Sequence, residues 1–595
     1  MKKNTLQKMM LAAALLTLVS CTQDELMKQS TALPDGVYPI TFTAAQALPE
    51  ETPNGTPQTR VSDNKENISS WTNGDKIKVT VNGNGYTNEE IVCTLDHNGV
   101  VTDYGKTLYW NSATAEAEFT GVYPEKTEDI TLKNQNSNNG LAYVMRAPKA
   151  KGSYGSPANL VFKHQLAKLC VTLKDGNKPL TGDYKLSVLN YASCDNTSGG
   201  AQGNGNLMFI PMRYNAETQC YEANIVPGTF EKDTEFYRIQ QTENGKVTKE
   251  ATAKLTNAST FKAGYVYSAT VTATTSSKWV PVITDREEYN IENDIIVNLG
   301  LGSRNDDPTR IKVAPQKNVT VTIRESRIGS NSFGHNPPIG PIVSIGAGAT
   351  VTLKVEGENY FHTRSGAGIE MQNGSSLTII GDGGEKTKLS ITTTGGNNEM
   401  GCPCIGSAYN KSGTLELESI TIKDVKLDLT QGGNYGNEHG AFFSSPAIGL
   451  THVMEGDTKQ NCKSIKIENS EVKITNNGDG ACIGTPGFTS YVTRSNLGYN
   501  INEIIIASST IDATSHGYGA CIGFGVKSDD NINGTIGTIS INTTDLKFKK
   551  TKTDSGAFCV GRGQMNTQVN PPTITKGISI DGKDEGKEGY DPPMQ

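Results

Sequence analysis

Cysteines are the residues of this chain whose type most readily carries chemistry, and the 595 residues contain eleven of them. Four of these stand at the same place in a recurring Cys-aliphatic-Gly motif: Cys404, Cys482, Cys521 and Cys559. If the motifs stack as strands, neighbouring cysteines lie roughly 4.8 Å apart, within the range of a disulfide, but their side chains point alongside one another. Metal ligation needs converging ligands, and only Cys402-Pro403-Cys404 approaches a Cys-x-x-Cys spacing. The pattern favours a column of buried thiols over disulfides or a metal site, and we assign no metal and no cofactor.

Acidic pairs are the second feature that could do chemistry, because polysaccharide lyases and hydrolases need converging carboxylates. Asp306-Asp307 and Asp529-Asp530 lie in polar stretches and have no equivalent in the other copies of the repeat. A Gly-x-Ser-x-Gly elbow is missing from the sequence, as is a phosphate-binding Gly-rich loop followed by a helix. The sequence therefore predicts no catalytic residue and a protein that is not an enzyme.

The N-terminus has the features of a secretory signal, with Lys2 and Lys3 before an apolar run that ends in Leu18-Val19-Ser20-Cys21. These last four residues match the bacterial lipobox, in which the cysteine is acylated and becomes the mature N-terminus. We therefore expect a lipid on Cys21 that anchors the protein to the outer membrane. The alternative is an ordinary signal with a cysteine there by chance.

Aromatic residues follow the copies of the repeat, among Asn, Gly and Ser. Aromatic faces flanked by amides suit sugar rings, which have one apolar face and a rim of hydroxyls. The alternative is that such rings cover the ends of a hydrophobic core. The candidate ligand-binding aromatics are Tyr409, Tyr435, Phe488, Tyr491, Tyr499, Tyr518 and Phe524.

The elements that must position these residues are set by the repeat itself. Its aliphatic residues Ile405, Ile448, Ile483, Ile522 and Val560 are separated by 43, 35, 39 and 38 residues. Between them lie short runs of alternating β-rich residues and polar turns, and no stretch has the period of a long amphipathic helix. One supersecondary unit per repeat predicts stacked coils, and we expect a right-handed parallel β-helix over residues 291–580.

The first half of the chain alternates strands and turns, which predicts an all-β sandwich region. The whole chain is therefore expected to be all-β, and its 63 glycines and 7% aromatics fit that class. A net charge of -7 without a basic run argues against a nucleic-acid partner.

The first half also resembles the fimbrillin family, the pilins and pilus-tip proteins of Bacteroidales. The resemblance covers residues 36–275 and rests on ordered motifs: Thr59-Arg60-Val61, Trp71-Thr72-Asn73-Gly74-Asp75-Lys76-Ile77, Leu108-Tyr109-Trp110, Phe119-Thr120-Gly121-Val122-Tyr123-Pro124, Phe162-Lys163-His164-Gln165-Leu166-Ala167 and Phe261-Lys262-Ala263-Gly264-Tyr265-Val266-Tyr267.

This resemblance implies export as a lipoprotein, cleavage after an arginine near the N-terminus, and polymerisation by a strand donated from another subunit. The matching arginine is Arg60, which would make Val61 the new N-terminus. The strand removed would include Ile40 and Phe42, and its loss would leave a groove open to β-augmentation. The alternative is that Arg60 is a solvated loop residue.

The expected domains are a signal peptide over 1–20, a propeptide over 21–60, a fimbrillin-like sandwich region over 61–275, a linker over 276–290, the β-helix over 291–580 and a polar tail over 581–595. Because the tail contains Asp591-Pro592-Pro593, it is a poor donor strand. A subunit that accepts a strand without donating one belongs at the end of a fibre.

The sequence thus predicts a fimbrium tip or accessory subunit that mediates cell adhesion at the cell surface. Its partners would be other fimbrial subunits, a glycan or protein on a host or bacterial surface, and the outer membrane. Two alternatives stay open: an anchored glycan-binding lipoprotein that never joins a fibre, and a β-helical polysaccharide lyase or hydrolase.

Overall fold

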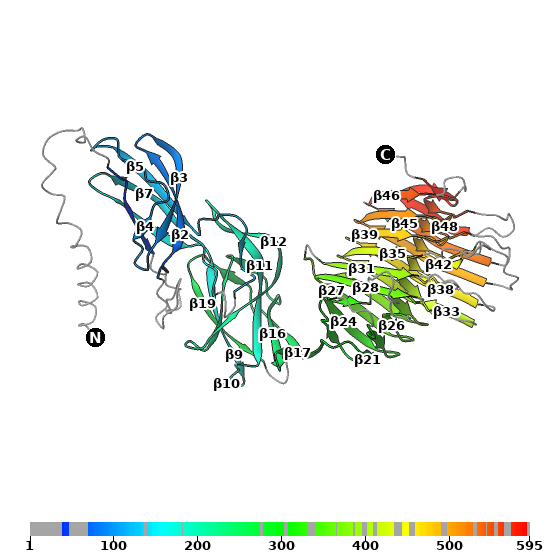
Figure 1. Cartoon of the computed structure of the whole chain (residues 1–595). Coiled ribbons are helices and arrows are strands. Elements are labelled where there is room, and N and C mark those ends of the chain that lie inside the picture. The colour runs from blue at the N-terminus through cyan, green and yellow to red at the C-terminus, as the bar shows by residue number, and fades with distance from the viewer. Residues whose placement is uncertain are drawn as a thin grey trace. The chain divides into compact units, whose positions relative to one another are not determined.

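The computed structural model divides the chain into two compact units (Figure 1). The first contains residues up to Ile239 and Ala251–Ser277, and the second contains Gln240–Glu250 and Lys278–Gln595. The structure describes residues 38–46, 70–135, 140–180, 182–273, 278–302, 307–329, 340–364, 366–384, 387–394, 402–408, 413–432, 443–451, 458–488, 497–526, 532–542, 544–551, 557–564 and 573–591. All elements in these ranges are strands, which confirms the prediction of an all-β protein. None of the described residues forms a helix that could cross a membrane.

A seven-stranded sheet forms the N-terminal part of the first unit. Its order is β1 (Phe42–Gln46), β8 (Ala158–His164), β7 (Met145–Ser153), β5 (Glu116–Tyr123), β2 (Asp75–Gly83), β3 (Tyr86–Leu95) and β4 (Val101–Asp103). The edge strand β1 runs parallel to β8, whereas the other neighbours are antiparallel. Within the described residues β1 is the first strand, and its pairing with β8 is the one parallel pairing of this sheet.

A five-stranded sheet follows in the same unit. Its central strand β9 (Ala167–Asp175) lies between β14 (Cys220–Ile225), which is antiparallel to it, and β19 (Val266–Thr272), which is parallel. Short strands β10 (Lys178–Pro179) and β13 (Arg213–Asn215) complete it. The long hairpin of β11 (Tyr184–Thr197) and β12 (Gly200–Pro211) is a further element of this unit.

The second unit is built from three sheets of mostly parallel strands. The first sheet holds β21 (Glu288–Ile291), β23 (Arg310–Val313), β26 (Val343–Ile345), β29 (Ile369–Met371), β32 (Ile405–Ser407), β37 (Ile448–Gly449), β40 (Ile483–Gly484), β44 (Ile522–Gly523), β47 (Val560–Gly561) and β50 (Gly589–Tyr590). The second runs through β20 (Val280–Ile283), β22 (Ile295–Val297), β24 (Asn318–Arg324), β27 (Thr350–Glu356), β30 (Ser376–Gly381), β33 (Gly413–Leu417) with β34 (Ser419–Lys423), β38 (Thr458–Glu468), β42 (Leu497–Ala507), β45 (Ile532–Asn542), β48 (Thr573–Ile580) and β49 (Lys583–Gly586). The third holds β25 (Arg327–Ile328), β28 (Glu358–Arg364), β31 (Lys388–Thr394), β35 (Lys426–Gln431), β39 (Glu471–Asn476), β43 (Thr510–Ser515) and β46 (Asp545–Lys550).

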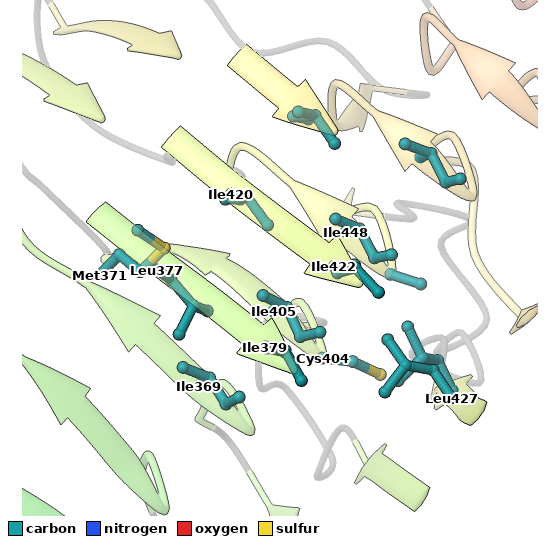
Figure 2. Packing of buried hydrophobic residues seen from close by; sticks show 14 of the residues in the cluster. Ile369, Met371, Leu377, Ile379, Cys404, Ile405, Ile420, Ile422, Leu427 and Ile448 are labelled. Atoms are coloured by element: carbon teal, nitrogen blue, oxygen red, sulfur yellow. The ribbon is translucent and has the colours of Figure 1, made fainter. Parts of the chain in front are cut away.

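From β23 to β48 the chain visits the three sheets in a constant order, once per repeat, and Figure 1 shows the strands stacked in chain order from green to red. The repeat residues Ile405, Ile448, Ile483, Ile522 and Val560 pair in register and are all fully buried. Figure 2 shows aliphatic side chains of successive strands gathered into one core. Burial of each repeat therefore depends on its neighbours above and below.

Tight turns join the second sheet to the third. In each of four repeats two residues connect the strands, and the first of them has a left-handed backbone: Glu325, Asp424, Asn469 and Ser508, with φ between 41° and 52°. Serines at the second position bind back to the preceding strand, as the Ser470 hydroxyl does to Glu468 O (2.7 Å) and the Ser509 hydroxyl to Ala507 O (2.8 Å). Asp, Asn and Ser tolerate this conformation and satisfy the turn's backbone groups, so the corner repeats with little strain.

Two strands of the third sheet, β39 and β43, end in a buried polar residue that binds the next corner. Buried Asn476 donates from Nδ2 to Gly480 O (3.0 Å) and Ala481 O (2.8 Å), and the Ser515 hydroxyl donates to Gly519 O (3.1 Å). These bonds fix the segment that leads into the repeat motif, because buried carbonyl groups need a donor.

The residues from Asp581 onward differ from the expected polar extension. Asp581 (φ 47°) and Gly582 (φ 79°) form a tight turn, after which β49 folds back onto β48 in antiparallel pairing. The dipeptide Asp-Gly favours such a two-residue hairpin. Strand β50 then pairs antiparallel with β47 and ends the first sheet.

The glycine that follows the aliphatic residue is required by the stacking. Gly449, Gly484 and Gly523 have φ of 142°, 140° and 131°, and a Cβ on each would lie 2.0, 1.9 and 2.1 Å from the carbonyl oxygen of the next glycine in the column. No side chain can occupy that space without moving backbone, so the small residue is fixed by contact between repeats as well as by φ.

We expect Gly484→Ala to lower the free energy of unfolding of the second unit by roughly 2–6 kcal/mol, the combined cost of backbone strain and overpacking. The matched control is Gly302→Ala, whose added Cβ would meet nothing within 4 Å. Thermal unfolding followed by circular dichroism compares the two. Equal melting temperatures for both variants would contradict the close backbone contact.

Candidate functional site: the groove filled by the first strand

The segment of residues 40–46, which contains β1, places three alternating apolar side chains in the core of the first unit. Ile40, Phe42 and Ala44 are 2%, 4% and 3% exposed, although the strand lies at the edge of its sheet. Phe42 packs against Phe119 at 5.9 Å and edge-on against Tyr104 at 5.5 Å between ring centroids. The period of two places these side chains in the core and Thr43 in solvent.

The backbone of this segment is bound on both sides. Residues Phe42–Gln46 pair with Ala158–Phe162 of β8. On the other side Ile40 N donates to Leu108 O, and Trp110 N donates to Tyr38 O, each at 2.8 Å. Removal of the strand would therefore leave two rows of backbone groups without partners as well as an apolar channel.

Trp71 closes one end of the groove. Its indole Nε1 donates to Ala44 O at 3.1 Å, and its ring packs edge-on against Phe162 at 5.3 Å and against Tyr123 at 5.5 Å. Gly99 lies beside it, and a Cβ there would be 2.1 Å from Ala44 O. No pattern in the sequence indicated Gly99, whereas Trp71 belongs to one of the motifs on which the resemblance rests.

The processing residues expected from the sequence, Cys21, Arg60 and Val61, lie outside the described residues. So do Tyr409, Tyr435 and Tyr491 among the aromatic candidates. Phe488 is described by its backbone in β41 (Gly487–Phe488), where it pairs with Phe443 of β36 (Phe443–Ser444).

The structure assigns two of the remaining aromatic candidates to the core. Tyr499 and Phe524 are 2% and 3% exposed and belong to the hydrophobic cluster of the second unit, so neither ring offers a face to a sugar. Tyr499 alternates with buried Leu497 and Ile501 in β42, a period-two pattern that was present in the sequence. Tyr518 is half-buried and is the candidate whose ring reaches the surface among those that the structure describes.

The repeat cysteines are free thiols, which confirms the predicted column. Cys404, Cys482 and Cys521 are buried and Cys559 is half-buried. Burial raises the pKa of the Cys404 thiol to about 12, and contact with Cys482, followed by burial, holds the pKa of Cys521 well above its usual value. The thiols of Cys404 and Cys521 therefore stay protonated and pack as small apolar groups.

A disulfide occurs where the sequence indicated none. Cys170 of β9 and Cys220 of β14 are bonded, with Cα atoms 5.7 Å apart. A spacing of 50 residues carries no signature of this pairing, which becomes visible once the two strands are adjacent.

Comparison with known proteins gives a family match for part of the chain. Residues 59–288 match the model of a family described as fimbrillin-like, so the chain carries a fimbrillin-like domain. No curated protein matches the chain.

Several solved structures from Bacteroides are similar to part of the chain. A candidate cell adhesion protein of Bacteroides uniformis is 22% identical over 35% of this chain and 92% of that one, with a TM-score of 0.27. Candidate cell adhesion proteins of Bacteroides thetaiotaomicron (17%, 39% and 91%, 0.26) and Bacteroides ovatus (15%, 41% and 96%, 0.30) follow the same pattern. TM-scores this low do not establish a shared fold, so the fimbrillin-like domain is assigned from the family match alone.

We expect Phe42→Ala to lower the free energy of unfolding of the first unit by about 3–5 kcal/mol, because it removes a ring from the core that β1 completes. Thr43→Ala, on the solvent face of the same strand, should change it by less than about 0.5 kcal/mol. Urea unfolding followed by the fluorescence of Trp71 and Trp110 measures both. Similar losses in the two variants would show that β1 is not held by its apolar face.

Proposed function

We propose that this chain is a fimbrium tip or accessory subunit that mediates adhesion, in which β1 is a removable strand. The observation that carries the proposal is the burial of Ile40, Phe42 and Ala44 in an edge segment that precedes Arg60 in the sequence. Cleavage after Arg60 would start the mature chain at Val61 and release β1. A strand from another fimbrial subunit would then fill the groove and pair with β8 by β-augmentation.

The C-terminal end supports a role as an acceptor. A donor subunit needs a free strand to offer, but β49 and β50 are paired with β48 and β47. Neither of these two strands is free to be donated. This agrees with a place at the tip.

The second unit is, in this proposal, a parallel β-helix that makes the adhesive contacts. The in-register parallel strands and their constant order through three sheets support it. The ligand would be a glycan or protein on a host or bacterial surface, and Tyr518 is the remaining aromatic candidate for contact within the described loops.

Export would follow the lipoprotein route, with acylation of Cys21 and transit through the outer membrane to the cell surface. The fimbrillin-like domain supports association with fimbrial subunits and a surface location. The lipid would be lost with the propeptide when the chain is cut after Arg60.

The test is the N-terminal sequence and lipid state of the protein from sheared surface fibres and, separately, from washed outer membranes. We expect a chain without lipid that begins at Val61 in the fibre fraction. Arg60→Ala should keep the protein lipidated and out of fibres, whereas Lys65→Ala, a nearby basic residue, should leave processing unchanged. A chain that begins at acylated Cys21 and occurs only in membranes would overturn the proposal in favour of an anchored surface lipoprotein.

A further inference from the structure

Three polar side chains are buried together between β9 and β14 of the first unit. Lys168 stands directly opposite Asn224 in the antiparallel register, and Glu222 is the next residue on the same face of β14. Their exposed fractions are 5%, 5% and 0%. Side chains that are directly opposite in such a pair have Cβ atoms roughly 4.5–5.5 Å apart, so a lysine can reach the carboxamide facing it.

Glu222 is positioned by the side chains around it. Its Oε1 lies 3.3 Å from Lys168 Nζ and accepts from Asn215 Nδ2 at 3.3 Å and from the Thr218 hydroxyl at 3.5 Å. A buried ion pair of this kind often contributes less to stability than an apolar pair of the same volume, because both charges lose their water. The Cys170–Cys220 disulfide already joins the same two strands. The ion pair between Lys168 and Glu222 is therefore expected to have a role other than stabilising the strand pair.

Asn224 is held in a fixed orientation. Its Nδ2 donates to Ala142 O at 2.8 Å, while its backbone N donates to Gln135 Oε1 at 2.9 Å and its backbone O accepts from Gln135 Nε2 at 2.8 Å. The carboxamide therefore cannot turn freely away from the lysine on the facing strand.

A pocket of about 10 Å³, room for one water-sized molecule, adjoins these groups. Its lining includes Lys168, Asn224, His164 and Tyr265. Burial, and then the charge of Lys168, lowers the pKa of His164 to about 4, so this imidazole is neutral at physiological pH. Lys168 is 5% exposed, and the pocket beside it has room for a leaving group of about the size of water.

We propose that Lys168 and Asn224 condense into an intramolecular isopeptide bond, with Glu222 as the proton carrier. Lys168 Nζ passes a proton to Glu222 Oε1 and its lone pair attacks Asn224 Cγ. The tetrahedral intermediate then breaks its Cγ–Nδ2 bond as protons reach Nδ2, and ammonia leaves as ammonium. One C–N bond forms and one breaks, Glu222 ends as the carboxylate, and no oxidant, metal or cofactor takes part.

The bond would join the same two strands as the disulfide but would survive reduction. The central strand β9 would then be covalently tied to β14 at two points, which would resist separation of the strands under load. This inference concerns a modification within the first unit and does not depend on the proposed place in a fimbrium.

The test is the mass of the full chain, purified after recombinant expression, then reduced and alkylated. We expect a mass lower by one ammonia than the sequence requires, and after proteolysis one branched peptide that links the segments containing Lys168 and Asn224. Reduction is essential because the disulfide joins these same segments.

Lys168→Arg and Glu222→Gln should each restore the full mass, while Lys178→Arg, on an exposed strand, should keep the loss. Formation of the Cys170–Cys220 disulfide shows that each variant has folded. Wild-type protein that has this disulfide but the full mass, and that yields two separate peptides on reduction, would overturn the proposal. So would conversion of Asn224 to aspartate, because water rather than Lys168 would then be the nucleophile.

Discussion

The hydrophobic core of the first unit depends on the apolar side chains of β1 and the residues just before it. Phe42 of β1 lies against Phe119 and the Trp71 indole binds Ala44 O, so the groove and its occupant form one packed layer. The core of this part of the first unit therefore includes three apolar side chains, Ile40, Phe42 and Ala44, from a segment at the edge of its sheet.

The second unit meets a different constraint, since each repeat is stable only when it lies against the next. The glycine column allows close contact between the backbones of successive repeats. Antiparallel strands cover the last parallel strand of the first and second sheets, where an open edge would invite further pairing. Near the beginning, Asp307 is buried and accepts from Thr309 N (3.0 Å) and Gly329 N (3.1 Å) while it pairs with Arg286. Asp307, which lies in a polar stretch of the sequence, is therefore a buried residue that holds together the first strands of the second unit.

The fold class and the repeat could be predicted from the sequence because both depend on local periodicity. Alternation predicted strands, and the spacing from Ile405 to Val560 predicted units that stack in register. Contacts between distant strands could not be predicted in this way. The Cys170–Cys220 bond and the pairing of Lys168 with Asn224 form only because β9 and β14 are neighbours in the folded sheet. Burial separates the aromatic candidates into core residues and residues near the surface, and burial depends on the face of the strand that a residue occupies. The alternation of apolar residues around Tyr499 could have indicated that its side chain points inward.

If β1 is replaceable, the first unit should bind a peptide with the sequence of this strand after the strand itself has been removed. The chain is cut after Arg60 with an arginine-specific protease, the released segment is removed, and a fluorescent peptide of residues 37–46 is added. We expect saturable binding of this peptide. We expect no binding of a peptide in which Ile40 and Phe42 are replaced by aspartate. Failure of the cut, folded chain to bind the natural peptide would contradict it.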